Sequence, residues 1–276
     1  DIFAENPYKA FWSNFERMEG FVTTIHLYLY FLILSSVLNV EKWWNRFFAT
    51  WVGSSILMCL FALLQVAGKA TINQGGVRVD GKFGNSTYLA VFLLFNIFFG
   101  VFLFLRSGDK KKVGWVIGVI SILELVILYL TATRGAILGL IGGMLVTVVL
   151  IAVLGKDGAN VRKVSVGVLV GIVALVGLFV VVRKTPMVQL SPVLSRFATL
   201  SISEVKTQGR YYIWPMAIEG WKERPVFGWG QEGFSYVFNK NYNPKMWAQE
   251  QWVDRAHSAP LDWLTASGII GFLAYI

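Results

Sequence analysis

Residues 86–105, STYLAVFLLFNIFFGVFLFL, contain no charged side chain at any position. A helix of about 20 residues rises about 30 Å, which matches the hydrocarbon thickness of a bilayer. This stretch therefore predicts a membrane-spanning helix. Further apolar runs predict spans near residues 21–40, 47–67, 113–132, 135–154, 164–182 and 259–276. We expect an all-α, multi-spanning transmembrane helical bundle with about seven spans.

The composition is typical of a membrane protein, and it argues against nucleic-acid binding, a disulfide framework and a structural zinc site. Charged residues make up 15% of the chain, whereas soluble domains carry about 25%. The formal charge of +9 does not indicate nucleic-acid binding, because many basic residues lie in short connectors, where they set membrane topology. A single cysteine and two histidines argue against a disulfide framework and a structural zinc site. We expect neither a metal nor an organic cofactor.

The chain begins at Asp1 without an initiator Met or a recognisable signal peptide, and it stops at Ile276 inside an apolar run. We interpret residues 1–276 as a single membrane domain, cut from a longer protein.

The longest polar segment, residues 183–258, predicts one large loop that contains short helices. One helix is expected over 211–221, with Pro215 in its first turn. The short connectors on one side of the bundle hold nine Lys or Arg residues, and the short segments on the other side hold six. The positive-inside rule places the richer side in the cytoplasm and the large loop outside the cell membrane.

Arg134 lies between two apolar runs with almost no polar connector. Placing Arg at the centre of a spanning helix costs roughly 2.5–3.5 kcal/mol on insertion scales, so a partner is expected. A phosphate-bearing lipid headgroup is one candidate partner. The alternative is an Arg that extends to the headgroups and only anchors a helix end.

The large loop carries two further arginines of interest. Arg210 follows Gly209 in a polar stretch, and its planar fork of donors matches phosphate oxygens. Arg196 is a similar but weaker candidate. An exposed loop Arg with no function is the ordinary alternative for both.

His257 is the only histidine in a polar segment, directly before the last apolar run. With an ordinary pKa of about 6.5, a histidine can accept a proton from a hydroxyl at neutral pH. The alternative is a histidine that is hydrogen-bonded at a helix start, with Ser258 as the N-cap. Glu124 lies inside an apolar run and has either a functional role or a structural bond to Gln65 or Asn39.

Several absences restrict the chemistry. The sequence has no Gly-rich phosphate loop, no His-Glu-x-x-His, no nucleophile elbow and no Asp-x-Asp motif for a divalent metal. Neutralisation of a phosphate group is therefore assigned to arginine.

The order of the motifs resembles the O-antigen ligase / O-antigen polymerase superfamily. Its members usually show Gly-Arg, Pro-x-x-Gly-x-Gly, His-Asn or His-Ser, and Gly-Ile-x-Gly in that order. The matching residues here are Arg134 at a span end, Gly209-Arg210, Pro225-Val226-Phe227-Gly228-Trp229-Gly230, His257-Ser258 and Gly268-Ile269-Ile270-Gly271. Residues 11–20 and 81–85 also look like segments of a bacterial branch of this group. Ser258 departs from the commoner Asn.

The resemblance implies a multi-pass glycosyltransferase of the bacterial inner membrane, active in polysaccharide or lipopolysaccharide biosynthesis for the cell envelope. It would transfer a glycan from undecaprenyl diphosphate to an acceptor hydroxyl on the external face, without a metal or a cofactor. Arg134 and Arg210 would correspond to the diphosphate-binding arginines of the family and His257 to its essential histidine. Direct attack by the acceptor would invert the anomeric centre.

Three acceptors stay open: lipid A-core, the growing polysaccharide, and a Ser or Thr of a secreted protein. Two other classes of function would predict different features of the sequence. A transporter or flippase for lipid-linked glycans predicts ionisable residues spread through several spans, whereas Glu124 and His26 are nearly alone here. A membrane scaffold leaves the order of Arg and His motifs unexplained.

Overall fold

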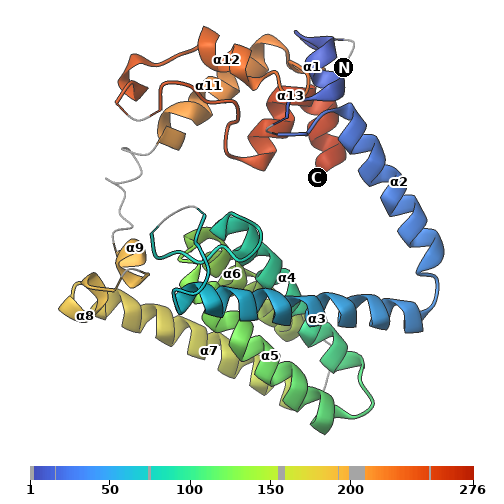
Figure 1. Ribbon diagram of the computed structural model, residues 1–276, viewed down its shortest axis with the longest axis vertical. Coiled ribbons are helices and arrows are strands. Elements are labelled where there is room, and N and C mark those ends of the chain that lie inside the picture. Colours follow the sequence, from blue (N-terminus) through green and yellow to red (C-terminus); the bar gives the residue numbers. More distant parts are fainter. Residues whose placement is uncertain are drawn as a thin grey trace. The chain divides into compact units, whose positions relative to one another are not determined.

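The computed structural model describes residues 3–15, 17–73, 76–154, 159–191, 193–198, 209–248 and 250–276. Every regular element in these ranges is helical, which confirms the all-α prediction (Figure 1). The chain forms two compact units. Unit 1 contains residues 1–38 and 201–276, and unit 2 contains residues 39–200.

Unit 2 is a bundle of long apolar helices. Its helices are α3 (Glu41–Val66), α4 (Ser86–Arg106), α5 (Lys110–Leu130), α6 (Arg134–Leu154), α7 (Ala159–Val182), α8 (Pro186–Gln189) and α9 (Leu194–Ala198). The first five are long and apolar enough to cross a membrane. Helices satisfy their own backbone polar groups, which is what a spanning segment needs where water is absent.

The core of unit 2 lies where α3, α4, α5 and α6 pack together (Figure 1). Leu89, Leu93 and Ile127 are fully buried there. Gly100 of α4 leaves room for Ile117 of α5, so the two backbones approach closely. Many outward-facing Leu and Val side chains stay exposed in this unit, as expected of surfaces that meet lipid tails.

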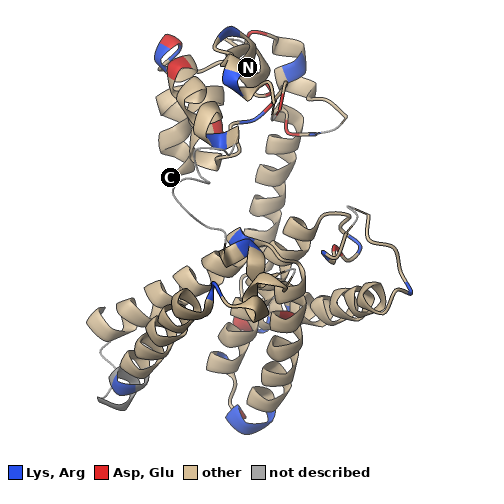
Figure 2. Cartoon of the chain, turned by 90° about the vertical axis from the view of Figure 1, so that its left-hand side faces the viewer, with Lys and Arg blue, Asp and Glu red and all other residues tan. Residues whose placement is uncertain are grey.

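Lys and Arg gather at the connection between α4 and α5 (Figure 2). Arg106 ends α4, and Lys110, Lys111 and Lys112 begin α5. Arg106 also forms an ion pair with Glu41 at the start of α3 (3.1 Å). Residues 41–46 were expected in a connector, but they are already helical in α3. Amphipathic Trp and Arg side chains tolerate a helix that extends into the interface.

Glu124 is buried in α5 and its carboxylate accepts a hydrogen bond from Ser55 Oγ of α3. This partner differs from the expected Gln65 and Asn39. Gln65 instead bonds to Asp80 and Gly81 in the connector between α3 and α4. A hydroxyl donor on the neighbouring helix gives Glu124 a structural partner within the bundle.

Unit 1 contains α1 (Pro7–Trp12), α2 (Phe21–Val37), α11 (Gly209–Glu223), α12 (Phe234–Lys240), a short 3-10 helix (Pro244–Met246) and α13 (Ala259–Tyr275). A core of apolar side chains from α11, α12 and the segment before α13 holds it together. The predicted helix over 211–221 is confirmed as α11. The expectation that Pro215 lies in its first turn is wrong, since Pro215 is inside the helix. The carbonyl that Pro215 cannot bond belongs to Tyr211, whose exposure lets solvent or headgroups hydrate it.

The first and last predicted spans differ from the other five. Helix α2 is apolar but has only 17 residues. Helix α13 is interrupted at Gly268, which has a φ of 64°. The count of seven spans stays a prediction, as do the single membrane domain and the external position of the loop over 183–258.

The break in α13 is the docking point for residues 225–230. Three backbone hydrogen bonds join them: Trp229 N–H to the Thr265 carbonyl (2.9 Å), Gly230 N–H to the Ala266 carbonyl (2.8 Å), and Ile269 N–H to the Pro225 carbonyl (2.8 Å). Groups that a continuous helix would pair internally are thus paired with this loop. The Pro-x-x-Gly-x-Gly motif and the segment that contains the Gly-Ile-x-Gly motif therefore contact each other directly.

Candidate functional site

A cavity of about 500 Å³ lies in unit 1, and His257 is part of its wall. We call it the His257 cavity. Nine of its twelve lining residues are polar or charged, among them Arg17, Glu19, Gln231 and Asp262, although more of the lining surface is apolar than polar. The lining residues come from the segment before α2, the first turns of α2, the loop after residue 230, the segment 255–258 and the start of α13. A hollow that combines polar side chains, an imidazole and apolar surface suits a small organic ligand that carries hydroxyl groups.

The backbone on both sides of His257 is fixed. The carboxylate of Asp262 accepts hydrogen bonds from Ala256 N–H (2.7 Å) and Ser258 N–H (3.2 Å). Trp214 Nε1 donates to the Ala256 carbonyl (3.2 Å). These bonds hold the segment although His257 itself has a φ of 53°, a left-handed conformation that non-glycine residues rarely adopt.

The imidazole of His257 is exposed, and it makes no hydrogen bond within the described ranges. The alternative prediction was a structural histidine, hydrogen-bonded at the helix start, with Ser258 as the N-cap of that helix. Ser258 does occupy the N-cap position, but its side chain makes no capping hydrogen bond. Asp262 of the first turn of α13 binds the backbone N–H groups instead. The imidazole is therefore available to a ligand.

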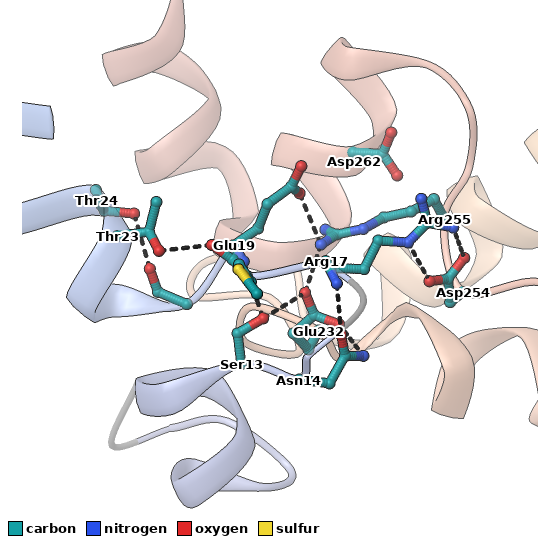
Figure 3. A network of polar contacts seen from close by, with 12 residues as sticks. Ser13, Asn14, Arg17, Glu19, Thr23, Thr24, Glu232, Asp254, Arg255 and Asp262 are labelled. Carbon is teal, nitrogen blue, oxygen red and sulfur yellow. Dashed lines mark hydrogen bonds and ion pairs between the residues drawn. The ribbon is translucent and has the colours of Figure 1, made fainter. Parts of the chain in front are cut away.

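At the cavity wall and beside it, a network of ion pairs and hydrogen bonds joins residues 13–19 to residues 232–255 (Figure 3). Arg255 Nη2 lies 2.6 Å from Glu232 Oε1 and 2.7 Å from Glu19 Oε2. Ser13 Oγ donates a further hydrogen bond to Glu232 (3.1 Å). Glu232 is buried, so it needs these partners, because an unpaired buried charge is strongly destabilising.

Arg17 and Asp254 form the second pair of this network. The guanidinium binds the carboxylate with two hydrogen bonds, at 2.6 and 2.7 Å, a fork geometry that is favourable for charged groups. Burial acts to raise the pKa of Asp254, but the hydrogen bonds and charge of Arg17 outweigh it and hold that pKa below its ordinary value. Asp254 is therefore ionised and binds Arg17 at neutral pH.

Arg210 lies in the first turn of α11 and is exposed. It is one helical turn before Trp214, and residues four apart share a face of a helix. Trp214 donates to the backbone carbonyl next to His257, and by its spacing Arg210 shares a face of α11 with Trp214. Arg210 is not among the residues that line the His257 cavity.

Arg134 and Arg196 belong to unit 2. Arg134 begins α6 directly after the turn 131–133. In this turn Ala132 is buried with a φ of 49°. Arg196 lies in α9. That these two arginines converge with Arg210 and His257 of unit 1 stays a prediction.

Arg78 was not singled out from the sequence, although it touches the turn before Arg134. Arg78 Nε donates to the Thr131 carbonyl (2.9 Å) and Nη2 donates to Thr133 Oγ1 (3.1 Å). Burial, and then the charge of Arg196, lower its pKa. Unit 2 therefore holds the positive charge of Arg78 at this turn. The only hint in the sequence is an Arg in the short loop between two spans.

The network residues Arg17, Glu232, Asp254 and Arg255 were also missed as site residues. Arg17 does occur in residues 11–20, one of the stretches that carry the family resemblance, and Arg255 lies two positions before His257. The two carboxylates have no motif of their own.

Comparison with known proteins agrees with the motif order. A family model described as O-antigen ligase matches residues 119–276, which is more than half of the chain. The match includes Arg134, Arg210 and His257. No curated protein matches the chain. The chain, an all-helical multi-pass membrane protein, belongs to the O-antigen ligase family, as its motifs predicted.

Proposed function

We propose that this chain is part of an enzyme that transfers a glycan from undecaprenyl diphosphate to an acceptor hydroxyl on the external face of the bacterial inner membrane. The observation that carries the proposal is His257, whose exposed imidazole forms part of a polar cavity wall and makes no hydrogen bond to the described protein. Membership of the O-antigen ligase family supports a glycosyltransferase of ligase or polymerase type.

In the proposed reaction, the acceptor hydroxyl gives its proton to His257 while its oxygen attacks the anomeric carbon of the donor. The bond from that carbon to the diphosphate oxygen breaks, and the diphosphate leaves with the electron pair. Attack from the opposite side inverts the anomeric centre. General base catalysis of this kind typically contributes 10²–10⁴-fold.

Negative charge grows on the diphosphate as it leaves, so fixed positive charge nearby lowers the barrier. We assign this role to Arg210, with Arg134 and Arg196 as further diphosphate ligands. Arg presents two parallel donors to phosphate oxygens, which a Lys cannot do. A diphosphate is already a good leaving group, so the proposal contains no general acid.

The test is glycan transfer in liposomes by the purified full-length protein. His257→Ala is expected to lower the rate by at least 10²-fold, and Arg210→Ala is expected to abolish detectable transfer. Both variants should insert into the membrane at the level of the unaltered protein. Near-full activity of either variant would refute its assigned role.

Two matched controls are available. His26 is the only other histidine, and its Nδ1 bonds to the Val22 carbonyl of its own helix, so His26→Ala is expected to keep transfer activity. Lys111 is exposed at the start of α5, on the side predicted to be cytoplasmic. Lys111→Ala is therefore the charge-matched control for Arg210→Ala.

A further inference from the structure

Unit 2 carries a groove at the end of its bundle where α3 and α5 begin and α4 ends. We call it the Lys42 groove, and its volume is about 780 Å³. We propose that this groove binds an anionic phospholipid of the membrane, with the phosphate at its charged mouth and the acyl chains along its apolar inner part. The site lies in another part of the chain than the His257 cavity and is independent of the proposed glycan transfer.

The mouth of the groove carries more positive than negative charge. Its lining includes Lys42, Arg46 and Arg106, against one carboxylate, Glu41. Glu41 forms its ion pair with Arg106, whereas Lys42 and Arg46 form no ion pair with any described residue. The guanidinium of Arg46 lies over the ring of Trp43, 4.9 Å from its centroid. Two cations four positions apart share one face of α3, so they can bind one phosphate group together.

All three helices change from charged to apolar lining in the same direction. In α3 the lining begins with Lys42 and ends with Ala49, two turns further along the helix. In α4 it extends from Arg106 at the helix end back to Leu103, and in α5 it reaches Ile117, two turns from the helix start. In spanning helices this gradient lies along the bilayer normal. A phospholipid has the same gradient, whereas a soluble anion has no apolar part for the inner end.

Asn45 adds a neutral polar group near the mouth, one turn after Lys42. Its side-chain amide makes no hydrogen bond within the described ranges, and its Oδ1 is buried. A buried acceptor without a donor is unfavourable. A half-turn of the amide brings this oxygen to the groove, where a hydroxyl of a glycerol headgroup can donate to it. A choline headgroup has no such donor, so phosphatidylglycerol is the probe of choice.

Basic residues at the ends of spanning helices also occur because they set topology. Lys111 and Lys112 are of this kind, since they are exposed at the start of α5 and do not line the groove. The Lys42 groove differs because its cations stand over an apolar hollow between helices, the arrangement in which anionic headgroups bind. The two lysines therefore provide a control that removes the same charge at the same end of the bundle.

The first experiment is native mass spectrometry of the purified full-length protein, titrated with phosphatidylglycerol or with phosphatidylcholine of the same acyl chains. We expect phosphatidylglycerol to bind about tenfold more tightly, and Lys42→Gln combined with Arg46→Gln to weaken its binding about tenfold. Lys111→Gln combined with Lys112→Gln should leave the affinity unchanged. Equal losses in the two double variants, or equal affinity for the two lipids, overturn the proposal. Displacement of phosphatidylglycerol by an equal concentration of inorganic phosphate also overturns it, because a free anion would then suffice.

The second experiment fills the inner end of the groove without a change of charge. Ala49 is exposed, so Ala49→Trp enlarges a side chain outside the core of unit 2, and it should weaken phosphatidylglycerol binding about tenfold. Thr50→Trp is the matched control, since Thr50 is an exposed neighbour that does not line the groove. Thermal unfolding in detergent without phosphatidylglycerol checks that every variant is folded. An unchanged affinity in folded Ala49→Trp would overturn the placement of the lipid in the groove.

Discussion

At the residue scale, Asp254 connects the stability of unit 1 to pH. Arg17 holds the pKa of Asp254 below its ordinary value against the opposing effect of burial. A carboxyl group whose pKa is lowered by folding stabilises the folded state while it is ionised, and it loses this contribution as the pH falls through its folded pKa. The contribution of Asp254 is therefore complete at neutral pH and declines below the ordinary value of about 3.9.

We expect Asp254→Asn to lower the stability of the protein by roughly 1.5–3 kcal/mol at neutral pH, the usual range for hydrogen bonds to charged groups. Thermal unfolding in detergent between pH 8 and pH 3 measures the effect. The difference between the two proteins should stay constant at neutral pH and shrink below about pH 4. Glu250→Gln is the control, since Glu250 is exposed. A difference that grows on acidification would contradict the assignment.

At the element scale, the contact between residues 225–230 and the break in α13 depends on Gly268. Its φ of 64° is unfavourable for an L side chain by roughly 1–2 kcal/mol. A Cβ at this position would also overlap the backbone of Val226 and Phe227. Backbone atoms tied by hydrogen bonds cannot move aside as a flexible side chain would.

We therefore expect Gly268→Ala to destabilise the protein by at least about 2 kcal/mol and to reduce transfer, since α13 begins beside His257. The thermal unfolding midpoint in detergent and the liposome assay measure the two effects. Gly171→Ala in α7 is the matched control, because nothing lies within 4 Å of its added Cβ. This change should be neutral or stabilise by up to about 1 kcal/mol. Equal midpoints for the two variants would show that the break tolerates a side chain.

The spanning helices could be predicted from the sequence, whereas the break in α13 could not. The five spanning helices were predicted because an apolar run long enough to cross a bilayer can form few other structures. The break in α13 was not predicted, since it depends on hydrogen bonds to residues about 40 positions earlier in the chain. The motif formed by Gly268 and Gly271 was recognised in the sequence, but it does not indicate which segment packs against α13 there.

The candidate site also contains one residue that the sequence could predict and others that it could not. His257 was accessible to sequence reasoning because it is the only histidine in a polar segment. The pair of Arg17 and Asp254 was not, since these residues are 237 positions apart and no local pattern joins them. Arg78 was missed for the same reason, because its partners Thr131 and Thr133 lie 53 and 55 positions away.

At the scale of the whole molecule, the proposed reaction draws residues from both compact units. Arg134 and Arg196 belong to unit 2, and Arg210 and His257 belong to unit 1. Their cooperation requires that all four face the same side of the membrane. Arg134 follows the C-terminal end of α5, whereas the Lys-rich connection to α4 is at its N-terminal end. If α5 spans the bilayer, these two ends face opposite compartments, so the side of the large loop can be tested against the α4–α5 connection.

The chain offers a clean labelling experiment, because its one cysteine, Cys59, is buried. Asn239→Cys places a thiol at an exposed position of the large loop, and Gly108→Cys places one at an exposed position between α4 and α5. In spheroplasts treated with a membrane-impermeant maleimide, we expect Asn239→Cys to be labelled at once and Gly108→Cys only after lysis, since basic connectors stay in the cytoplasm. The protein with Cys59 alone should stay unlabelled in both conditions. The reverse pattern would place His257 in the cytoplasm, where an acceptor on the external face cannot reach it. Labelling of both positions before lysis would mean that α5, α6 and α7, which lie between them in the chain, do not all cross the bilayer.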